Sequence, residues 1–200
     1  GEDVVHAYED LYNTMDDALN EVEDSLREVD NILGVDTTKA NDDIETALTA
    51  NSESDFENAQ DEYRAVSETY DTVFAAHSLL TASDYNDLDN LTDDVDNLLD
   101  STDDLLNTTD DILATAPTIG LYTTDAEEAN RAIMATEIDN ITTISATFLN
   151  AVQAVESSYT SEDTNLSSYE AALAEAEQAL AQAQVQEATD VNSAEVSVEV

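Results

Sequence analysis

Two histidines are the side chains best suited to acid–base or metal chemistry in this chain of 200 residues. His6 follows Asp3 by three positions, so both could project from one helix face, as the Glu-x-x-His pairs of di-metal bundles do. Such a centre draws its ligands from several helices, and one pair falls far short of that set. His77 lies on a predicted apolar seam, where a histidine is typically packed and hydrogen-bonded. We therefore predict no metal site at either histidine.

Acidic residues are dense between positions 84 and 96, a composition that suggests a calcium-binding loop. An EF-hand loop needs alternating acidic ligands, a central glycine and a terminal glutamate. This stretch has no glycine and its apolar spacing is helical, so it predicts a hydrated acidic helix face. We expect diffuse K⁺, Na⁺ or Mg²⁺ counterions and no cofactor. The acidic residues are Asp84, Asp87, Asp89, Asp93, Asp94 and Asp96.

Other catalytic patterns are missing from the sequence. The chain has no cysteine, which excludes disulfides, thiolate metal sites and cysteine nucleophiles. It has three glycines in all, so it has no glycine-rich phosphate loop. Serine and aspartate occur throughout and specify no triad. We therefore predict that the protein is not an enzyme.

The net charge is extreme. There are 48 Asp and Glu residues against four basic residues, and the formal net charge is −44. Four cations cannot pair with 48 anions, so solvent cations must screen the repulsion, and the Debye length falls to about 3 Å at 1 M salt. Binding to a nucleic-acid backbone needs clustered basic residues, which excludes that class of partner. The basic residues are Arg27, Lys39, Arg64 and Arg131.

This composition resembles that of proteins from extremely halophilic archaea. The shared features are an excess of Asp and Glu, a near-absence of lysine, abundant threonine and alanine, and no cysteine. The resemblance concerns composition along the whole chain and indicates a habitat, not a family. It implies that the protein folds and stays soluble in very high salt.

Apolar residues recur at alternating spacings of three and four, which predicts helices with a heptad seam. We expect a first long helix over about 3–33, ended by Gly34. A second begins at a capping box formed by Ser54 and Glu57 and ends at about residue 80. A third runs over about 88–112. A short helical segment over 36–51 would turn Ala40, Ile44 and Ala47 inward. The predicted seams of the long helices are Tyr8, Tyr12, Met15, Leu19, Val22, Leu26, Val29 and Leu33; Phe56, Ala59, Tyr63, Val66, Tyr70, Val73, His77 and Leu80; and Leu88, Leu91, Val95, Leu98, Thr102, Leu105, Thr109 and Ile112.

A loop over 116–123 follows, and its Ile119, Leu121 and Tyr122 could close the end of a bundle. Thr124 with Glu127 forms a second capping box, which begins the last helix. The Ser, Thr and Asp residues over 157–168 favour helix poorly and predict a kink or short turn there, with one unbroken helix over 125–187 as the alternative. The predicted seam of this helix is Met134, Ile138, Ile141, Phe148, Val152, Val155 and Tyr159, continued by Leu166, Tyr169, Leu173, Ala176, Leu180 and Ala183.

Together these patterns predict an all-α protein, an elongated antiparallel four- or five-helix bundle with coiled-coil heptad packing over residues 1–188. Residues 189–200 alternate apolar and polar side chains, which predicts a tail that is disordered or becomes a strand with a partner. Val196, Val198 and Val200 are the candidate contact residues of that tail.

The function expected from these features is a non-enzymatic structural or protein-interaction module of a halophilic archaeon or its virus, at the cell or particle surface. A protein partner or self-assembly is expected. The main alternative is a sensory or ligand-binding ectodomain of a membrane receptor, with a pocket lined by Tyr63, Tyr70 and His77. A cytoplasmic scaffold is a further alternative.

The chain has no apolar run long enough to span a membrane. It opens with Gly1 and not with Met, which leaves two interpretations open: a processed chain whose signal peptide or anchor was trimmed, and a tag remnant.

Overall fold

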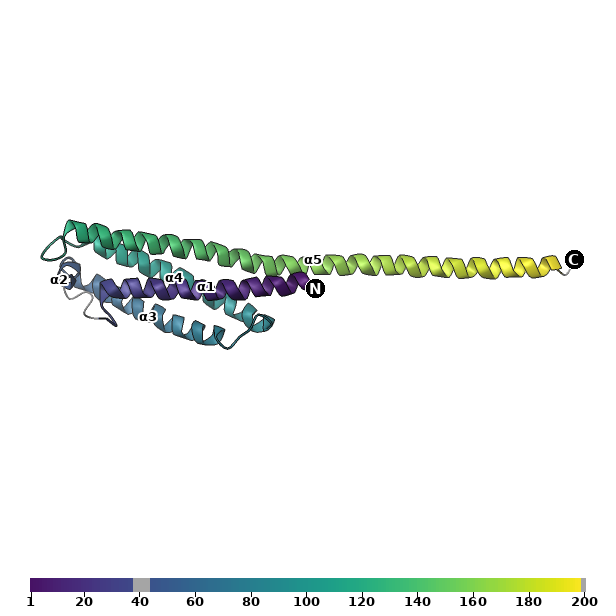
Figure 1. The fold of residues 1–200 in the computed structure, drawn as a ribbon, viewed down its shortest axis with the longest axis horizontal. Helices are drawn as coiled ribbons and strands as arrows, with labels where there is room; N and C mark the ends of the chain where they lie inside the picture. Colours follow the sequence, from purple (N-terminus) through teal and green to yellow (C-terminus); the bar gives the residue numbers. More distant parts are fainter. Residues whose placement is uncertain (38–43, 199–200) are drawn as a thin grey trace. The chain divides into compact units, whose positions relative to one another are not determined.

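The computed structural model describes residues 1–37 and 44–198, with side chains as far as residue 194. Over these residues the backbone is helical with short connections and no strand, so the predicted all-α class is confirmed. The helices, labelled in Figure 1, are α1 (Glu2–Leu33), α2 (Glu45–Leu48), α3 (Glu53–His77), α4 (Tyr85–Thr115) and α5 (Thr124–Val198).

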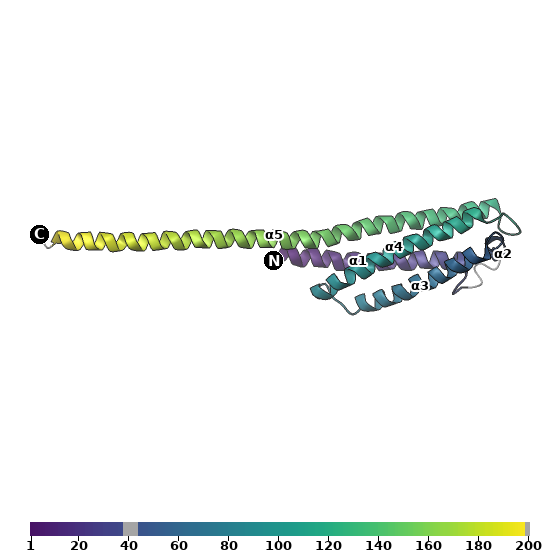
Figure 2. The ribbon, with the colours of Figure 1, turned by 180° about the vertical axis from the view of Figure 1, so that it is seen from behind.

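The chain divides into two compact units, residues 2–155 and residues 156–200, and Gly1 is grouped with the second. In the first unit, α1, α3, α4 and the first part of α5 lie side by side, as both Figure 1 and Figure 2 show. Sequence periodicity predicts a bundle that continues to residue 188, whereas this unit ends at Val155.

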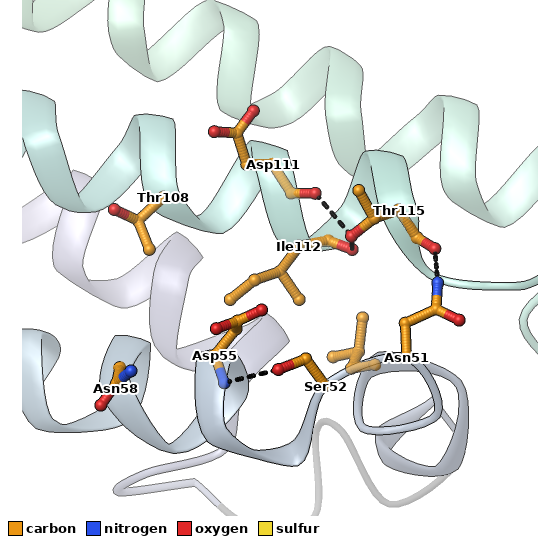
Figure 3. Close-up of a pocket in the computed structure, with 9 residues that line it drawn as sticks. Asn51, Ser52, Asp55, Asn58, Thr108, Asp111, Ile112 and Thr115 are labelled. Atoms are coloured by element: carbon orange, nitrogen blue, oxygen red, sulfur yellow. Dashed lines mark hydrogen bonds between the residues drawn. The ribbon is translucent and has the colours of Figure 1, made fainter.

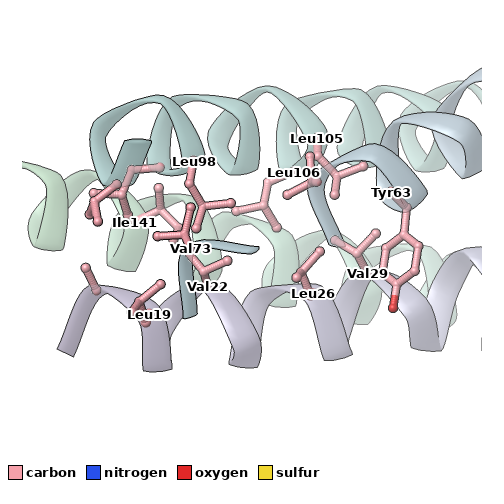
Figure 4. Packing of buried hydrophobic residues seen from close by; sticks show 14 of the residues in the cluster. Leu19, Val22, Leu26, Val29, Tyr63, Val73, Leu98, Leu105, Leu106 and Ile141 are labelled. Atoms are coloured by element: carbon pink, nitrogen blue, oxygen red, sulfur yellow. The ribbon is translucent and has the colours of Figure 1, made fainter. Parts of the chain in front are cut away.

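The core of the first unit follows the predicted seams. All eight seam residues of α4 are buried, and in α1 every seam residue except the half-buried Tyr12 is buried. α5 contributes Met134, Ile141, Phe148 and Val155, which are spaced by seven residues and are at most 5% exposed. Figure 4 shows part of this core, with Leu19, Val22, Leu26 and Val29 of α1, Tyr63 and Val73 of α3, Leu98, Leu105 and Leu106 of α4, and Ile141 of α5.

Two threonines take seam positions in α4 without leaving a hydroxyl unpaired. Thr102 and Thr109 are buried, and each donates its hydroxyl to the carbonyl oxygen four residues earlier, at 2.7 and 2.8 Å. Among the described residues, no buried side-chain nitrogen or oxygen lacks a hydrogen-bond partner. A threonine can therefore serve in this core because its polar atom is satisfied within its own helix.

The end of α1 depends on one glycine and one buried carboxylate. Gly34 has a φ of 63°, and its N–H donates to the Asp30 carbonyl at 2.8 Å, which confirms the predicted role of Gly34. The Asp30 side chain is 5% exposed, and its Oδ1 accepts from the N–H groups of Val35 and Asp36 at 2.9 and 2.7 Å. A seven-residue pattern does not reveal this role, because Asp30 is one of many acidic residues in α1.

Both predicted capping boxes are wrong by one or two residues. Ser52, not Ser54, caps α3, since its hydroxyl accepts from the N–H of Asp55 at 3.2 Å. Thr123, not Thr124, accepts from the N–H of Ala126 at 3.3 Å at the start of α5. Neighbouring Ser and Thr residues offer several competing caps, and spacing to a glutamate does not choose among them.

The loop before α5 closes one part of the core with a single aromatic residue. Tyr122 is fully buried and donates its hydroxyl to the Leu113 carbonyl at 3.1 Å. Ile119 and Leu121 are 43% and 66% exposed, so the expectation that all three residues close the bundle is wrong for these two. The turn at Gly120, with a φ of 60°, separates the buried residue from the exposed ones.

The segment predicted as a short helix over 36–51 contains the four-residue helix α2. Ala47 and Leu48 of α2 are buried and Ile44 is half-buried, in agreement with the predicted inward face. Ala40 lies outside the described residues, as does Lys39.

α5 is one continuous helix, so the kink predicted over 157–168 is wrong. Its Ser and Thr hydroxyls bond to carbonyls four residues earlier, and those of Thr160, Thr164 and Ser168 do so at 2.9 to 3.1 Å. The segment has no proline or glycine, the residues that most often break a helix. Poor helix propensity alone is a weak signal when each added residue gains a backbone hydrogen bond.

The backbone of the predicted strand-like tail is helical as far as Val198. A lone strand has no partner for its backbone groups, whereas a helix satisfies them within itself. The side chains of Val196 and Val198 lie outside the described residues, as does all of Val200.

The burial of the α4 seam yields a direct test of the core. We expect Leu98→Asp to reduce the free energy of unfolding by about 3–5 kcal/mol, because it places an unpaired charge at a fully buried position. Thermal unfolding followed by circular dichroism in concentrated KCl measures this change. Asn97→Asp, at the exposed neighbouring position, adds the same charge and should leave the midpoint nearly unchanged. An unaltered midpoint for Leu98→Asp would show that this seam is not buried.

Candidate functional site

The predicted ligand-pocket residues Tyr63, Tyr70 and His77 lie seven residues apart on α3 and are each used in packing. Tyr63 is buried and donates its hydroxyl to Asp36 Oδ2 at 2.9 Å. Tyr70 is half-buried and donates to Glu23 Oε2 at 3.2 Å. Their hydroxyls therefore reach different partners and do not converge on one space.

Both phenols are held in the neutral form. Burial, with the hydrogen bond to Asp36, raises the pKa of Tyr63 well above its usual range. Burial and the charge of Glu23 raise the pKa of Tyr70 to about 12. Each phenol therefore acts as a hydrogen-bond donor to a carboxylate at neutral pH, and neither is suited to accept a proton from a substrate.

His77 is packed against an aromatic residue of α1. Its ring is 2% exposed and stacks on Tyr12, with ring centroids 4.6 Å apart and planes inclined by 23°. His77 Nε2 lies 3.4 Å from the Tyr12 carbonyl oxygen. This environment is that of a core histidine, because the ring is covered on its face and has a polar neighbour at one nitrogen.

A surface pocket of about 730 Å³ lies where α2 and the start of α3 approach the end of α4 (Figure 3). The amide of Asn51 donates to the Thr115 carbonyl, and the Ser52 hydroxyl is occupied by the cap of α3. These groups are used where helices end. The lining residues are Leu48, Asn51, Ser52, Asp55, Asn58, Thr108, Asp111, Ile112 and Thr115.

No group of three or more His, Cys, Asp or Glu side chains in the described chain is arranged to hold a metal ion. His6 is exposed, and its Nδ1 lies 3.0 Å from Glu9 Oε2, which raises the pKa of His6. Asp84 accepts from the N–H and the hydroxyl of Thr81 at 2.7 and 2.8 Å, which lowers the pKa of that carboxyl. Both residues are therefore used in local hydrogen bonds.

The arginines of the first unit each pair with nearby acids. Arg27 lies 2.8 Å from Asp24 and Arg64 lies 2.6 Å from Asp61, each within one turn of helix. Arg131 of α5 makes a two-pronged contact with Asp110 of α4, at 2.8 and 3.0 Å. All three guanidinium groups are exposed, so these pairs contribute little to stability, typically about 0–1 kcal/mol each.

Three carboxyl groups have raised pKa values, which means that the folded protein disfavours their charged form. Partial burial raises the pKa of Asp96, Asp103 and Glu137, and neighbouring acids add to the effect. A folded-state pKa above the unfolded value stabilises the fold at acidic pH, and this contribution is lost as the pH rises through the folded pKa. Hydrogen bonds from Asn107 to Asp103 and from Ser25 to Glu137 favour the ionised forms, but they do not offset the burial that raises these pKa values.

Residues 156–194 present an uncovered apolar stripe. Leu166, Tyr169, Leu173 and Leu180 are 56%, 74%, 60% and 61% exposed. Ala176 and Ala183 complete the seven-residue pattern and are also exposed. We call these six residues the α5 stripe. Each of them is a predicted seam residue.

The α5 stripe has the same spacing as the buried seam of the first unit. Phe148 and Val155 are buried, and Tyr169, Ala176 and Ala183 follow Val155 at multiples of seven residues. The sequence therefore predicts which residues face a partner, but it also predicts that this chain's own bundle covers them. In the second unit no described residue from 159 to 194 is buried. The candidate functional site is this stripe.

Comparisons with known protein families, curated proteins and solved structures give no match to this chain. Among the described residues, no helix is sufficiently long and apolar to cross a bilayer. The functional proposal therefore depends on the geometry of the chain itself.

Proposed function

We propose that this chain is a non-enzymatic structural or protein-interaction module, and that the α5 stripe is its interface. The observation that supports this proposal is the exposure of three leucines and one tyrosine on one helix face at coiled-coil spacing. Burial of a leucine is worth about 1.5–3 kcal/mol relative to exposure, so a covered stripe is strongly favoured over a hydrated one. Contiguous exposed apolar residues generally mark interaction surfaces.

The arrangement proposed for the first unit is an antiparallel bundle with heptad packing. The short connections between its long helices favour antiparallel neighbours. Buried positions alternate at spacings of three and four, as in Leu91, Val95, Leu98 and Leu105 with Thr102 between them. In this proposal the unit is a rigid support that carries the interface.

The proposed setting is a halophilic archaeon or its virus, at the cell or particle surface. The support is the charge of −44 and the shortage of protein cations to offset it. The raised pKa values of Asp96, Asp103 and Glu137 agree with a carboxylate surface that relies on solvent cations.

The sensory-ectodomain alternative gains no support from the core. Tyr63, Tyr70 and His77, the residues expected around a ligand, are engaged with Asp36, Glu23 and Tyr12. We therefore retain the interaction module as the proposed function.

Because the chain has no natural cysteine, single cysteines can report whether the stripe is covered. We expect Ala176→Cys, on the stripe, to react with N-ethylmaleimide in intact source cells at least about tenfold more slowly than Ala171→Cys. This ratio corresponds to a covered state favoured by about 1.4 kcal/mol. The labelled fraction is read by mass spectrometry after denaturing purification.

Ala171→Cys is the matched control, because Ala171 is also exposed and lies five residues away on the opposite face of the helix. Equal reactivity of the two cysteines in cells would overturn the proposed interface. Protection at position 176 alone would support it, whatever the covering partner is.

The halophilic setting makes a second prediction. Dialysis from about 3 M KCl to about 0.1 M should abolish most of the circular-dichroism signal at 222 nm, because the Debye length then grows to about 10 Å and carboxylate repulsion is no longer screened. Returning the salt should restore the signal. Full helicity retained at the lower salt concentration would contradict the halophile interpretation.

A further inference from the structure

We propose that the partner of the α5 stripe is a second copy of this chain, aligned parallel and in register. This inference rests on the proposed function, because it names what covers the proposed interface. Its support comes from three features of residues 156–194: the layers of the stripe, the residues that bound it, and the charges that flank it.

The stripe forms six apolar layers in the heptad pattern. Leu166, Leu173 and Leu180 take position a, and Tyr169, Ala176 and Ala183 take position d. No polar residue interrupts positions a and d between 166 and 183, so a copy of the same helix would bury no unpaired polar group in this seam. Three uninterrupted heptads are the length at which such a pattern indicates a coiled coil.

Acidic residues at the seam positions bound the stripe and set its register. Glu162 takes position d before the stripe, and Glu187 takes position a after it. An in-register pair aligns all six apolar layers and places Glu162 and Glu187 each beside the same residue of the second copy at the ends of the stripe, where water and salt screen the repulsion. A shift of seven residues would leave four of those layers and would place Glu162 and Glu187 opposite Tyr169 and Leu180, which costs desolvation of a carboxylate. The in-register alignment is therefore favoured.

The flanking positions favour parallel over antiparallel pairing. Position e is acidic in four successive heptads, whereas position g is uncharged at Asn165, Ala172 and Ala179. In a parallel pair each e residue lies beside a g residue of the second copy, so Glu170 and Glu177 would meet Asn165 and Ala172. An antiparallel pair would place e beside e, and the two acidic rows would repel. The e residues are Glu156, Asp163, Glu170 and Glu177.

The same heptad pattern explains why a second copy can cover the α5 stripe and why a dimer is favoured over a three-helix assembly. A second copy supplies an uncharged row beside the acidic one and needs no basic residue, and this chain has none after Arg131. The same surface on both chains is self-complementary about a two-fold axis. Alanine at two of three d positions leaves a narrow seam, which suits close approach of two helices better than the wider centre of a three-helix assembly.

Light scattering of the purified chain in concentrated KCl measures its mass in solution and so tests whether the partner is a second copy. The expected mass is twice the 21.6 kDa of one chain. The double variant Leu173→Asp/Leu180→Asp should return the mass to that of one chain, and it should leave the thermal midpoint of the first unit unchanged. Its control, Ala171→Asp/Gln178→Asp, adds the same charges on the opposite face and should remain a dimer.

Oxidation of the Ala183→Cys variant tests whether the two copies pair in a parallel or an antiparallel arrangement. Position 183 lies near one end of the stripe, so the two cysteines meet in a parallel in-register pair and lie far apart in an antiparallel one. We expect a disulfide-linked dimer on a non-reducing gel for Ala183→Cys and no such dimer for Ala171→Cys. A dimer in solution whose Ala183→Cys variant does not cross-link would overturn the parallel arrangement.

The outcomes separate this inference from the proposed function. A single-chain mass for the unmodified protein, together with protection of Ala176→Cys in cells, would overturn the second copy and leave the interface in place with another protein, such as a basic helix that pairs with the acidic e row. A single-chain mass together with full labelling of Ala176→Cys in cells would overturn both.

Discussion

An apolar stripe on a helix must be covered, and the α5 stripe is exposed in this chain. α5 has 75 residues, whereas α1, α3 and α4 have 32, 25 and 31. Apolar seam residues of α5 recur from Met134 to Ala183, with Glu162 interrupting the pattern at one d position, and burial ends at Val155. The excess length of the seam is what makes an external partner necessary in this account.

The high negative charge of the chain limits how its apolar seam can be covered, because carboxylates flank the seam. A chain with 48 acidic and four basic residues cannot neutralise its own charge, so folding and the proposed assembly must both avoid placing acidic rows together. In the proposed dimer, the uncharged row of Asn165, Ala172 and Ala179 would lie beside the acidic row of the second copy. Concentrated salt then weakens the remaining repulsion, and excluded salts strengthen apolar burial. Small seam residues such as alanine and threonine are compatible with these conditions.

Much of the fold could be predicted from the sequence because helices and seams are local properties. All eight predicted seam positions of α4 and seven of the eight in α1 are buried, but the spacing does not identify further buried residues such as Leu99 and Leu106 of α4 or Leu11 and Ile32 of α1. Spacing predicts helix ends less well, because Ser52 and Ser54 are both plausible caps and only the three-dimensional arrangement selects Ser52. The buried Asp30 escapes a pattern-based analysis for a related reason, since its role depends on the turn that follows Gly34.

The residues of the α5 stripe were predicted as seam residues of the bundle and not as an interaction site. Periodicity identifies Leu166, Leu173 and Leu180 as partner-facing, and it contains no information on whether the partner is in the same chain. The kink or turn predicted over 157–168 would divide this seam between two shorter helices of one bundle, so the predicted helix lengths do not reveal that residues 166–183 are exposed. Tyr63 and His77 were expected to line a ligand pocket, but both side chains are buried in the core.

Amide hydrogen exchange along α5 in concentrated salt tests the central claim most directly. A helix of this composition standing alone in water is only marginally stable, whereas a covered one is held closed. We predict that the amides of residues 166–183 are protected at least about 100-fold over the unfolded chain, with protection of the same kind as in α4. Exchange of residues 166–183 at unprotected rates, while α4 stays protected, would contradict the claim that the stripe is covered.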